Sequence, residues 1–224
     1  MRMMNGGKKT ILNMGPGDGL SVLDYPFFDG TMCCALRGNN KLYILTCSHI
    51  LTKGNYANYG GYLQQPFPAV EQPVPEPLGT WAYALLNEEF DIALVEPSPE
   101  QVAKLVPAQG FSQPRIVDND DAVQRTAVTM LGYKSGTQRG EVVQITAKSS
   151  FTYGNQDLEL TNLIKVGNPV SETVFQPISQ PGDSGAIIYD DNGYALGMVM
   201  GSDEQFTYAI PMQNILDLLN MTIY

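Results

Sequence analysis

One histidine, His49, limits the acid–base chemistry that this 224-residue chain could perform. Imidazole gains and loses a proton near neutral pH, which suits a general base. Asp91 opens the apolar run DIALV, where a carboxylate is expected to be buried and to need a partner such as an imidazole N–H. Ser184 lies in PGDSGA, where Gly182 and Gly185 permit a tight turn whose backbone N–H groups converge. Together these residues could support nucleophilic catalysis by a serine hydroxyl.

Each of these residues also has a structural interpretation when it is taken alone. His49 ends the apolar strand predicted in ILTCSHILT and could simply pack there. Asp91 could cap the start of a strand, and a GDSG turn also occurs in ordinary loops. Cys47, two residues before His49, is an alternative thiol nucleophile, but no glycine-rich turn surrounds it to supply oxyanion donors.

Short apolar runs separated by turn residues predict a mostly β protein. Val, Ile, Tyr and Thr, which favour strands, dominate these runs. Gly38-Asn39-Asn40 separates the first two runs and predicts a β-hairpin. The expected strands cover residues 31–37, 41–46, 79–86, 91–95, 127–133, 141–147, 185–190, 194–201 and 206–210. Many short strands of this kind indicate a sandwich or a pair of barrels.

Two segments predict helices and two predict loops. Residues 98–106 begin with Ser98 as an N-cap and a capping box, and residues 212–220 show apolar side chains at helical spacing. The proline-rich residues 64–77 predict an extended surface loop. The acidic residues 117–121 predict a solvated loop between two halves of the chain.

Composition excludes several classes of protein. A hydrophobic content of 43% excludes a disordered chain, and a net charge of −10 disfavours binding to nucleic acid or anionic membranes. No apolar run reaches the roughly 20 residues of a membrane span, and the first residues lack the apolar region of a secretory signal. Cys33, Cys34 and Cys47 are expected to be reduced and mostly buried. We therefore expect a cytoplasmic protein with neither nucleic-acid nor membrane partners.

Three short motifs resemble those of the chymotrypsin/trypsin-like serine peptidases, closest to bacterial intracellular-type trypsin-like peptidases. TCSHI is similar to the family's histidine motif, FDIALV to its aspartate motif and PGDSGA to its serine motif. They occur in the order His–Asp–Ser, which is the family's order along the chain. The segment LGYKSGTQRGEV also resembles the one that opens the family's second barrel. The resemblance covers residues 30–220.

The resemblance implies an all-β fold with two six-stranded antiparallel β-barrels and a C-terminal helix. The first barrel, residues 30–115, would carry His49 and Asp91. The second barrel, residues 116–224, would carry the serine motif and the helix. Residues 1–29 would form a separate N-terminal segment, whose sequence suggests no role.

The resemblance also implies a serine endopeptidase that works through an acyl-enzyme. Ser184 would attack the peptide carbonyl, His49 would transfer the proton and Asp91 would orient the imidazole. The backbone N–H groups of Gly182 and Ser184 would hold the oxyanion. Neither a metal nor a cofactor is implied. The expected partners are protein or peptide substrates, and an activating partner protein remains open.

The residues of a specificity pocket are inferred from the family resemblance alone. The resemblance places Ile178 at the base of the pocket, and Ser179, Met200, Gly201 and Ser202 along its walls and beside the substrate. An uncharged base favours an apolar or small residue at the cleaved bond rather than Lys or Arg. Glutamate-specific members use a second histidine in this region, and this chain contains only one.

Two departures from the family pattern keep a second class of function open. Met200 stands where many members have a serine near the buried aspartate. The chain also lacks the Ile-Val-Gly-Gly start whose amino group pairs with the aspartate before the serine, so Asp183 needs another partner that the sequence does not identify. The alternative is therefore a gated or inactive binding module on the trypsin fold.

Overall fold

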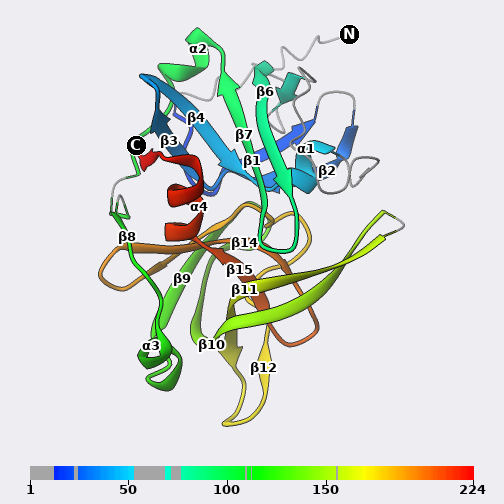
Figure 1. Ribbon diagram of the computed structural model, residues 1–224, viewed down its shortest axis with the longest axis vertical. Helices are drawn as coiled ribbons and strands as arrows, with labels where there is room; N and C mark the ends of the chain where they lie inside the picture. Colours follow the sequence, from blue (N-terminus) through cyan, green and yellow to red (C-terminus); the bar gives the residue numbers. More distant parts are fainter. Residues whose placement is uncertain are drawn as a thin grey trace, which may run out of the picture.

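Two β-sheets and a few short helices make up the described part of the chain. The computed structural model describes residues 13–22, 25–52, 69–71, 77–108, 110–111, 113–154 and 156–224. An N-terminal sheet and a C-terminal sheet lie one above the other along the long axis of the molecule (Figure 1). Strands dominate and the last helix lies near the C-terminus, which confirms the all-β class with a C-terminal helix.

The N-terminal sheet has the strand order β16-β3-β4-β7-β6-β5-β1-β2. Its members are β1 (Gly19–Val22), β2 (Tyr25–Thr31), β3 (Cys34–Gly38), β4 (Lys41–Thr46), β5 (Ala69–Glu71), β6 (Pro77–Leu86), β7 (Asp91–Pro97) and β16 (Thr222–Ile223). The predicted hairpin between β3 and β4 is confirmed, because Asn39 and Asn40 both have positive φ, as a two-residue turn requires. Strand β7 is buried along almost its whole length, so its first residue, Asp91, lies inside the protein.

The C-terminal sheet contains six strands whose antiparallel pairings close a ring. The ring runs β10-β9-β13-β14-β15-β11 and returns to β10. The strands of this sheet are β8 (Gln113–Pro114), β9 (Ala127–Gly132), β10 (Gly136–Tyr153), β11 (Gln156–Pro169), β12 (Phe175–Gln176), β13 (Ile187–Asp190), β14 (Tyr194–Ser202) and β15 (Thr207–Pro211). Bulges occur along the β10–β11 hairpin, where Thr146 and Asn162 adopt positive φ.

The helices agree only in part with the sequence predictions. Helix α4 (Met212–Leu219) confirms the predicted C-terminal helix, and Asn220 ends it in the left-handed conformation. Helix α2 (Pro99–Val102) is shorter than predicted, because Leu105 pairs with Met14 in a β-bridge. The predicted capping box is also wrong, since the Ser98 side chain makes no capping bond.

The acidic segment 117–121 is not the solvated loop that the sequence predicted. Asp118 caps helix α3 (Asn119–Val123) and forms a capping box with Asp121. Asp121 is 7% exposed and accepts two hydrogen bonds from the Arg115 guanidinium, at 2.8 and 2.9 Å. This bidentate pair fixes the start of the helix, and a further bond from Arg115 to Asp190 of β13, at 3.2 Å, links it to the C-terminal sheet.

Several strands were not predicted. Strand β1 and most of β2 lie in the segment 1–29, whose sequence suggested no role, and β11 and the last part of β10 were not expected. In the proline-rich segment, residues 69–71 form β5 and Pro77 begins β6, while residues 64–68 and 72–76 lie outside the described residues.

Buried Thr31 joins the two sheets at the serine motif. Its backbone N–H donates to the Ser184 carbonyl at 2.7 Å, and its hydroxyl donates to the Gly182 carbonyl at 2.9 Å. The same hydroxyl accepts a bond from the Tyr133 N–H at 3.1 Å. Both flanks of the serine turn are therefore fixed to the end of β2, although more than 150 residues separate them in the sequence.

One apolar cluster crosses the junction between the sheets. It contains Leu36 and Leu45 from the N-terminal sheet, Leu160 and Met198 from the C-terminal sheet, and Ile215 from α4. All five side chains are excluded from solvent. Burial of this shared apolar surface stabilises the two sheets as one unit, so residues from both can form a single site.

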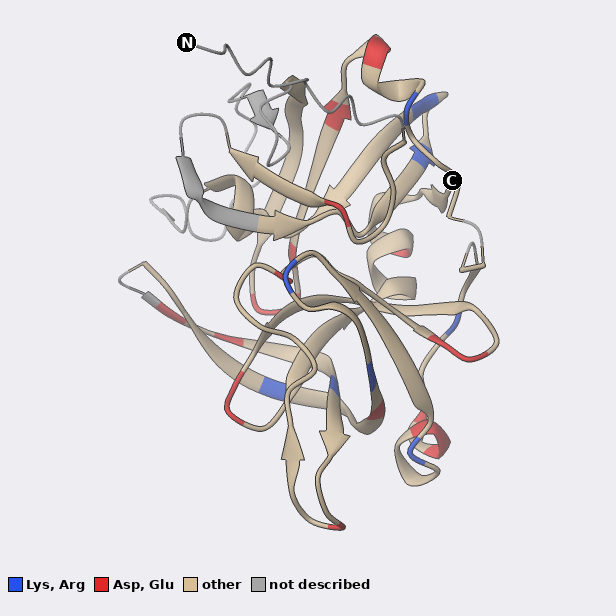
Figure 2. Ribbon diagram, turned by 180° about the vertical axis from the view of Figure 1, so that it is seen from behind, with Lys and Arg blue, Asp and Glu red and all other residues tan. Residues whose placement is uncertain are grey.

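The basic residues of the described chain lie mostly in its C-terminal half. Figure 2 shows Lys and Arg on several strands and loops of the C-terminal sheet, whereas in the N-terminal sheet they lie near the β3–β4 hairpin. None of the described helices is long and apolar enough to cross a membrane.

The three cysteines are free and buried, as the sequence predicted. Burial, followed by the nearby Asp91, raises the pKa of Cys47 well above its ordinary value, and burial together with its cysteine neighbours raises that of Cys33. Raised pKa values keep the Cys33 and Cys47 thiols protonated and unreactive.

We predict that the native protein resists N-ethylmaleimide at pH 8, because its cysteines are 0% exposed and two of them have raised pKa values. Intact-mass spectrometry should show no adduct on the native protein and three adducts after unfolding in guanidinium. Rapid modification of Cys47 in the folded protein would contradict this expectation and revive the thiol-nucleophile alternative.

Candidate active site

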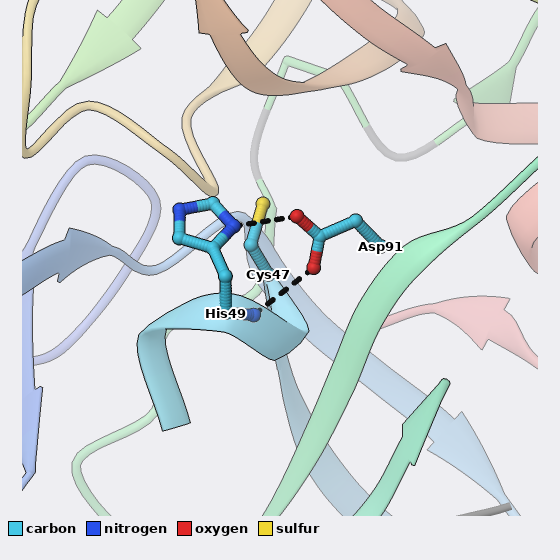
Figure 3. Close-up of side chains that lie close together, drawn as sticks. All are labelled: Cys47, His49 and Asp91. Carbon is cyan, nitrogen blue, oxygen red and sulfur yellow. Dashed lines mark hydrogen bonds and ion pairs between the residues drawn. The ribbon is translucent and has the colours of Figure 1, made fainter. Parts of the chain in front are cut away.

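His49 and Asp91 form a two-point contact (Figure 3). The His49 ring atom Nδ1 lies 2.5 Å from Asp91 Oδ2, and the His49 backbone N–H donates to Oδ1 at 3.0 Å. The sequence placed His49 at the end of a strand. In the structure β4 ends at Thr46, and His49 lies in the short helix α1 (Ser48–Thr52). The helical turn brings the ring and the backbone N–H of one residue to the same carboxylate.

This contact fixes the form of the imidazole. An ionised carboxylate only accepts hydrogen bonds, so Nδ1 carries the proton that Asp91 accepts. The other ring nitrogen, Nε2, points away from Asp91 (Figure 3). It is the atom with a free lone pair in the neutral ring, which is what a general base requires. The His49 side chain is 19% exposed and the Asp91 side chain 0%. A substrate can therefore contact the imidazole, whereas the carboxylate that orients it is excluded from solvent.

A third donor reaches Asp91 from the other sheet. The hydroxyl of Tyr153, the last residue of β10, donates to Asp91 Oδ2 at 3.0 Å. Tyr153 is 7% exposed, and its ring centroid lies 5.8 Å from that of His49. Sequence reasoning missed this residue because it ended the strand at residue 147, six positions before Tyr153.

Cys47 lies beside the pair but takes no part in it. Its Sγ donates to the Val199 carbonyl at 3.3 Å. Cys47, His49 and Asp91 offer three potential metal ligands within 4.8 Å of one another. However, two atoms bound to one tetrahedral zinc at about 2.0–2.1 Å would lie about 3.4 Å apart. The 2.5 Å contact between His49 and Asp91 is that of a hydrogen bond, so this arrangement does not fit a zinc site.

The serine motif forms a tight turn with two unused donors. Pro181 and Gly182 occupy its central positions, Gly182 has φ +101°, and the Asp183 N–H donates to the Gln180 carbonyl at 3.0 Å. Proline followed by a residue of positive φ is typical of a type II turn. Within the described residues, the N–H groups of Gly182 and Ser184 donate to no protein acceptor.

The structure identifies the hydrogen-bond donors to Asp183, which the sequence could not. Its carboxylate is fully buried and accepts bonds from the Lys134 and Ser135 N–H groups at 2.8 and 3.0 Å, and from the Gln180 N–H at 3.0 Å. The Ser135 hydroxyl donates to it at 2.5 Å. Lys134 and Ser135 belong to the motif KSG between β9 and β10. Four donors therefore hold the acid that precedes Ser184.

Ser184 lies next to the segment that carries His49. The Val199 carbonyl accepts from both the Gly185 N–H, at 2.7 Å, and Cys47 Sγ, so the residue after Ser184 and a residue just before α1 meet at one atom. The Gly185 backbone also lies so close to β2 that a Cβ there would sit 2.0 Å from the Thr31 carbonyl oxygen. The Ser184 hydroxyl itself donates to the Met200 carbonyl at 3.1 Å.

The five residues expected to form the specificity pocket fall into two groups. Ile178 is 5% exposed and belongs to the core of the C-terminal sheet, and Ser179 is bonded to the Thr207 hydroxyl at 2.8 Å. Met200, Gly201 and Ser202 form the end of β14, where the Met200 carbonyl faces Ser184. The backbone of this second group is thus the part that lies against the serine.

The chain is similar to known proteins in sequence and in fold. Residues 32–198 match the family described as "Trypsin-like peptidase domain". A search of curated protein sequences found no match.

Solved structures of proteases share the fold. A glutamic acid specific serine protease aligns with a TM-score of 0.66 at 14% identity, over 94% of this chain and 100% of that chain. Protease A of Thermobifida fusca gives 0.65 at 13% identity, over 94% and 98% of the two chains. The chymotrypsin of Cellulomonas bogoriensis gives 0.61 at 17% identity, over 95% and 98%. The family match includes His49, Asp91 and Ser184, and on this evidence the chain belongs to the chymotrypsin/trypsin-like serine proteases.

Proposed function

We propose that this protein is a serine endopeptidase in which His49, Asp91 and Ser184 form the catalytic triad. The observation that carries the proposal is the bond between His49 Nδ1 and the fully buried Asp91, with the serine turn docked against the same segment. The family match supports the reaction class. The triad assignment rests on the geometry of the described residues.

In the proposed reaction the Ser184 hydroxyl first exchanges its hydrogen-bond partner. It leaves the Met200 carbonyl and donates to His49 Nε2, which removes the proton as Oγ attacks the peptide carbonyl. The imidazolium that forms keeps its Nδ1–H on Asp91, whose charge stabilises it. The proton then passes to the leaving amine, and water hydrolyses the acyl-enzyme by the same route.

The serine turn would supply the oxyanion hole. The N–H groups of Gly182 and Ser184 have no acceptor among the described residues, so they are available to a developing negative charge. Two bonds hold the turn in place. The Thr31 hydroxyl donates to the Gly182 carbonyl, and the Asp183 carboxylate accepts from the Lys134 N–H. Preorganised donors of this kind are worth roughly 3–4 kcal/mol each in the transition state.

An extended peptide would bind along the end of β14. Strand β13 pairs with residues 195–198 of β14, so residues 200–202 extend beyond that partner, and the Met200 carbonyl lies beside Ser184. A substrate N–H that bonds to the Met200 carbonyl would free the Ser184 hydroxyl for His49. We propose an apolar or small residue at the cleaved bond, because Ile178 and Ser179 bring no charge to this region.

One observation favours a second candidate, a gated binding module. In the structure the Ser184 hydroxyl bonds to the Met200 carbonyl rather than to the imidazole. A protein that kept this arrangement with a peptide bound would hold the peptide without cutting it. The following experiments separate the two candidates.

We predict that a fluorophosphonate probe labels the wild-type protein at Ser184 and that Ser184→Ala abolishes the labelling. His49→Ala should reduce the labelling rate by a factor of about 10³ or more, because the hydroxyl loses its general base. Gel fluorescence and peptide mapping measure both effects, with circular dichroism as a check on folding. Folded wild-type protein that never labels would favour the binding module.

We predict that Ser135→Ala lowers kcat about tenfold with little change in KM, because one of the four donors to Asp183 is lost and the oxyanion turn loosens. Ser135→Thr, which keeps the hydroxyl, should restore most of the activity. Ser150→Ala, at an exposed serine of β10, is the matched control. Unchanged kcat in Ser135→Ala would show that the turn does not depend on this bond.

We predict that cleavage of a diverse peptide library occurs after apolar or small residues, because Ile178, at the expected pocket base, and Ser179, on its expected wall, are uncharged. Mass spectrometry of the products measures the preference, and Ser184→Ala provides the blank. A preference for Arg or Lys would show that Ile178 does not form the base of the pocket.

A further inference from the structure

The buried carboxylate of Asp91 receives hydrogen bonds from both sheets. Among the described residues its donors are the backbone N–H and Nδ1 of His49 and the hydroxyl of Tyr153. A carboxylate with 0% exposure needs several donors to keep its charge. Cys47 does not help, because its thiol donates to the Val199 carbonyl. Among the described residues, Tyr153 is therefore the one residue other than His49 that donates a hydrogen bond to Asp91.

We propose that Tyr153 is a positioning residue of the hydrolytic site, whose hydroxyl anchors Asp91 and thereby sets the orientation and basicity of His49. This inference rests on the proposed function, because it assigns Tyr153 a part in the same triad. It also assigns the C-terminal sheet a second contribution to the site: that sheet supplies Ser184, and through β10 it completes the acid–imidazole pair of the N-terminal sheet.

The fold delivers Tyr153 by an extended strand. Strand β10 runs from Gly136 to Tyr153, and the β10–β11 hairpin projects beyond the rest of the C-terminal sheet beneath the N-terminal sheet (Figure 1). Gly154, at φ +60°, turns the chain directly after Tyr153. The phenol can therefore reach Asp91 without a break in the strand.

Phe151 anchors the same stretch of β10. Residues two apart share one face of a strand, so Phe151 and Tyr153 point to the same side. The Phe151 ring covers Gly201, where a Cβ would lie 2.9 Å from the Phe151 ring, and it meets Tyr208 edge-on at 5.8 Å. This packing holds the end of β10 against the end of β14, next to the proposed substrate edge.

The hydroxyl of Tyr153 has a definite electrostatic effect on the pair. A donor on Oδ2 disperses part of the negative charge of Asp91, which moderates its hold on a protonated imidazole. Without this donor the carboxylate stabilises the imidazolium more strongly, so His49 stays protonated to a higher pH. The titratable groups that face His49 among the described residues are Asp91, Cys47 and Tyr153, and the raised pKa of Cys47, due first to burial, keeps its thiol neutral.

The test compares Tyr153→Phe with the matched control Tyr189→Phe. Tyr189 stacks on Phe111 at a centroid distance of 5.2 Å, and its hydroxyl has no partner among the described residues. We expect Tyr153→Phe to lower kcat/KM about tenfold, the scale of one hydrogen bond to a charged group. The acid limb of its pH profile should move to higher pH by some tenths of a unit. Tyr189→Phe should change neither quantity.

A second measurement does not require turnover. His49 is the only histidine in the chain, so its ring signals are assigned in NMR spectra without ambiguity. Tyr153→Phe should shift the midpoint of the His49 titration upward. 3,5-Difluorotyrosine at position 153, a stronger donor of nearly the same size, should shift it downward. Opposite shifts from two nearly isosteric side chains would not arise from a purely structural role.

The outcomes separate this inference from the proposed function. An unmoved His49 titration and an unmoved acid limb in Tyr153→Phe would overturn the role of Tyr153, even in an active enzyme. A wild-type protein that neither labels nor cleaves would overturn the proposed function, and the NMR titrations would still decide whether Tyr153 acts on His49. If Tyr153→Phe does not fold, the difluorotyrosine protein provides the same decision.

Discussion

The site depends on the burial of one carboxylate at the junction of two sheets. Asp91 opens a strand that is covered on both faces, so its charge is removed from water and must be compensated by donors. His49 meets this demand with its ring and its backbone, and Tyr153 meets it from the other sheet. The same bonds that stabilise the buried charge fix the imidazole with Nε2 free. Stability and chemistry thus impose the same geometry.

A second buried carboxylate, that of Asp183, fixes the turn that carries Ser184, as the carboxylate of Asp91 fixes the orientation of His49. Asp183 is held by the KSG turn and by Gln180, and the positive φ of Gly182 aims the backbone of the turn. Thr31 closes the arrangement from β2 by bonding to the carbonyls on both flanks of the turn. These contacts lie within the described chain, so the serine turn is formed by internal donors. Among the described residues, the N–H groups of Gly182 and Ser184 are the donors of the turn that these contacts leave without an acceptor.

Local signals in the sequence predicted local structure well and distant partners poorly. The Asn39-Asn40 hairpin and the amphipathic pattern of α4 each depend on neighbours in sequence, and both are confirmed. The acidic run 117–121 is an exception, because its partners are local: Asp118 caps the helix and Arg115, six positions before Asp121, pairs with that carboxylate. The helix at 98–106 was shortened by a contact with Met14, some ninety residues earlier.

By itself the sequence determined the residue types at the site. A single histidine, an aspartate at the head of an apolar run and a serine between two glycines restrict the chemistry, because function depends on the acids, bases and nucleophiles available. The tertiary structure decided which groups support them. Thr31, Ser135 and Tyr153 are ordinary residues in sequence, and each acts through a bond that spans from 48 to 151 positions along the chain. Such bonds exist only once folding has brought segments far apart in the sequence together, within one sheet or between the two, which is why no local pattern could reveal them.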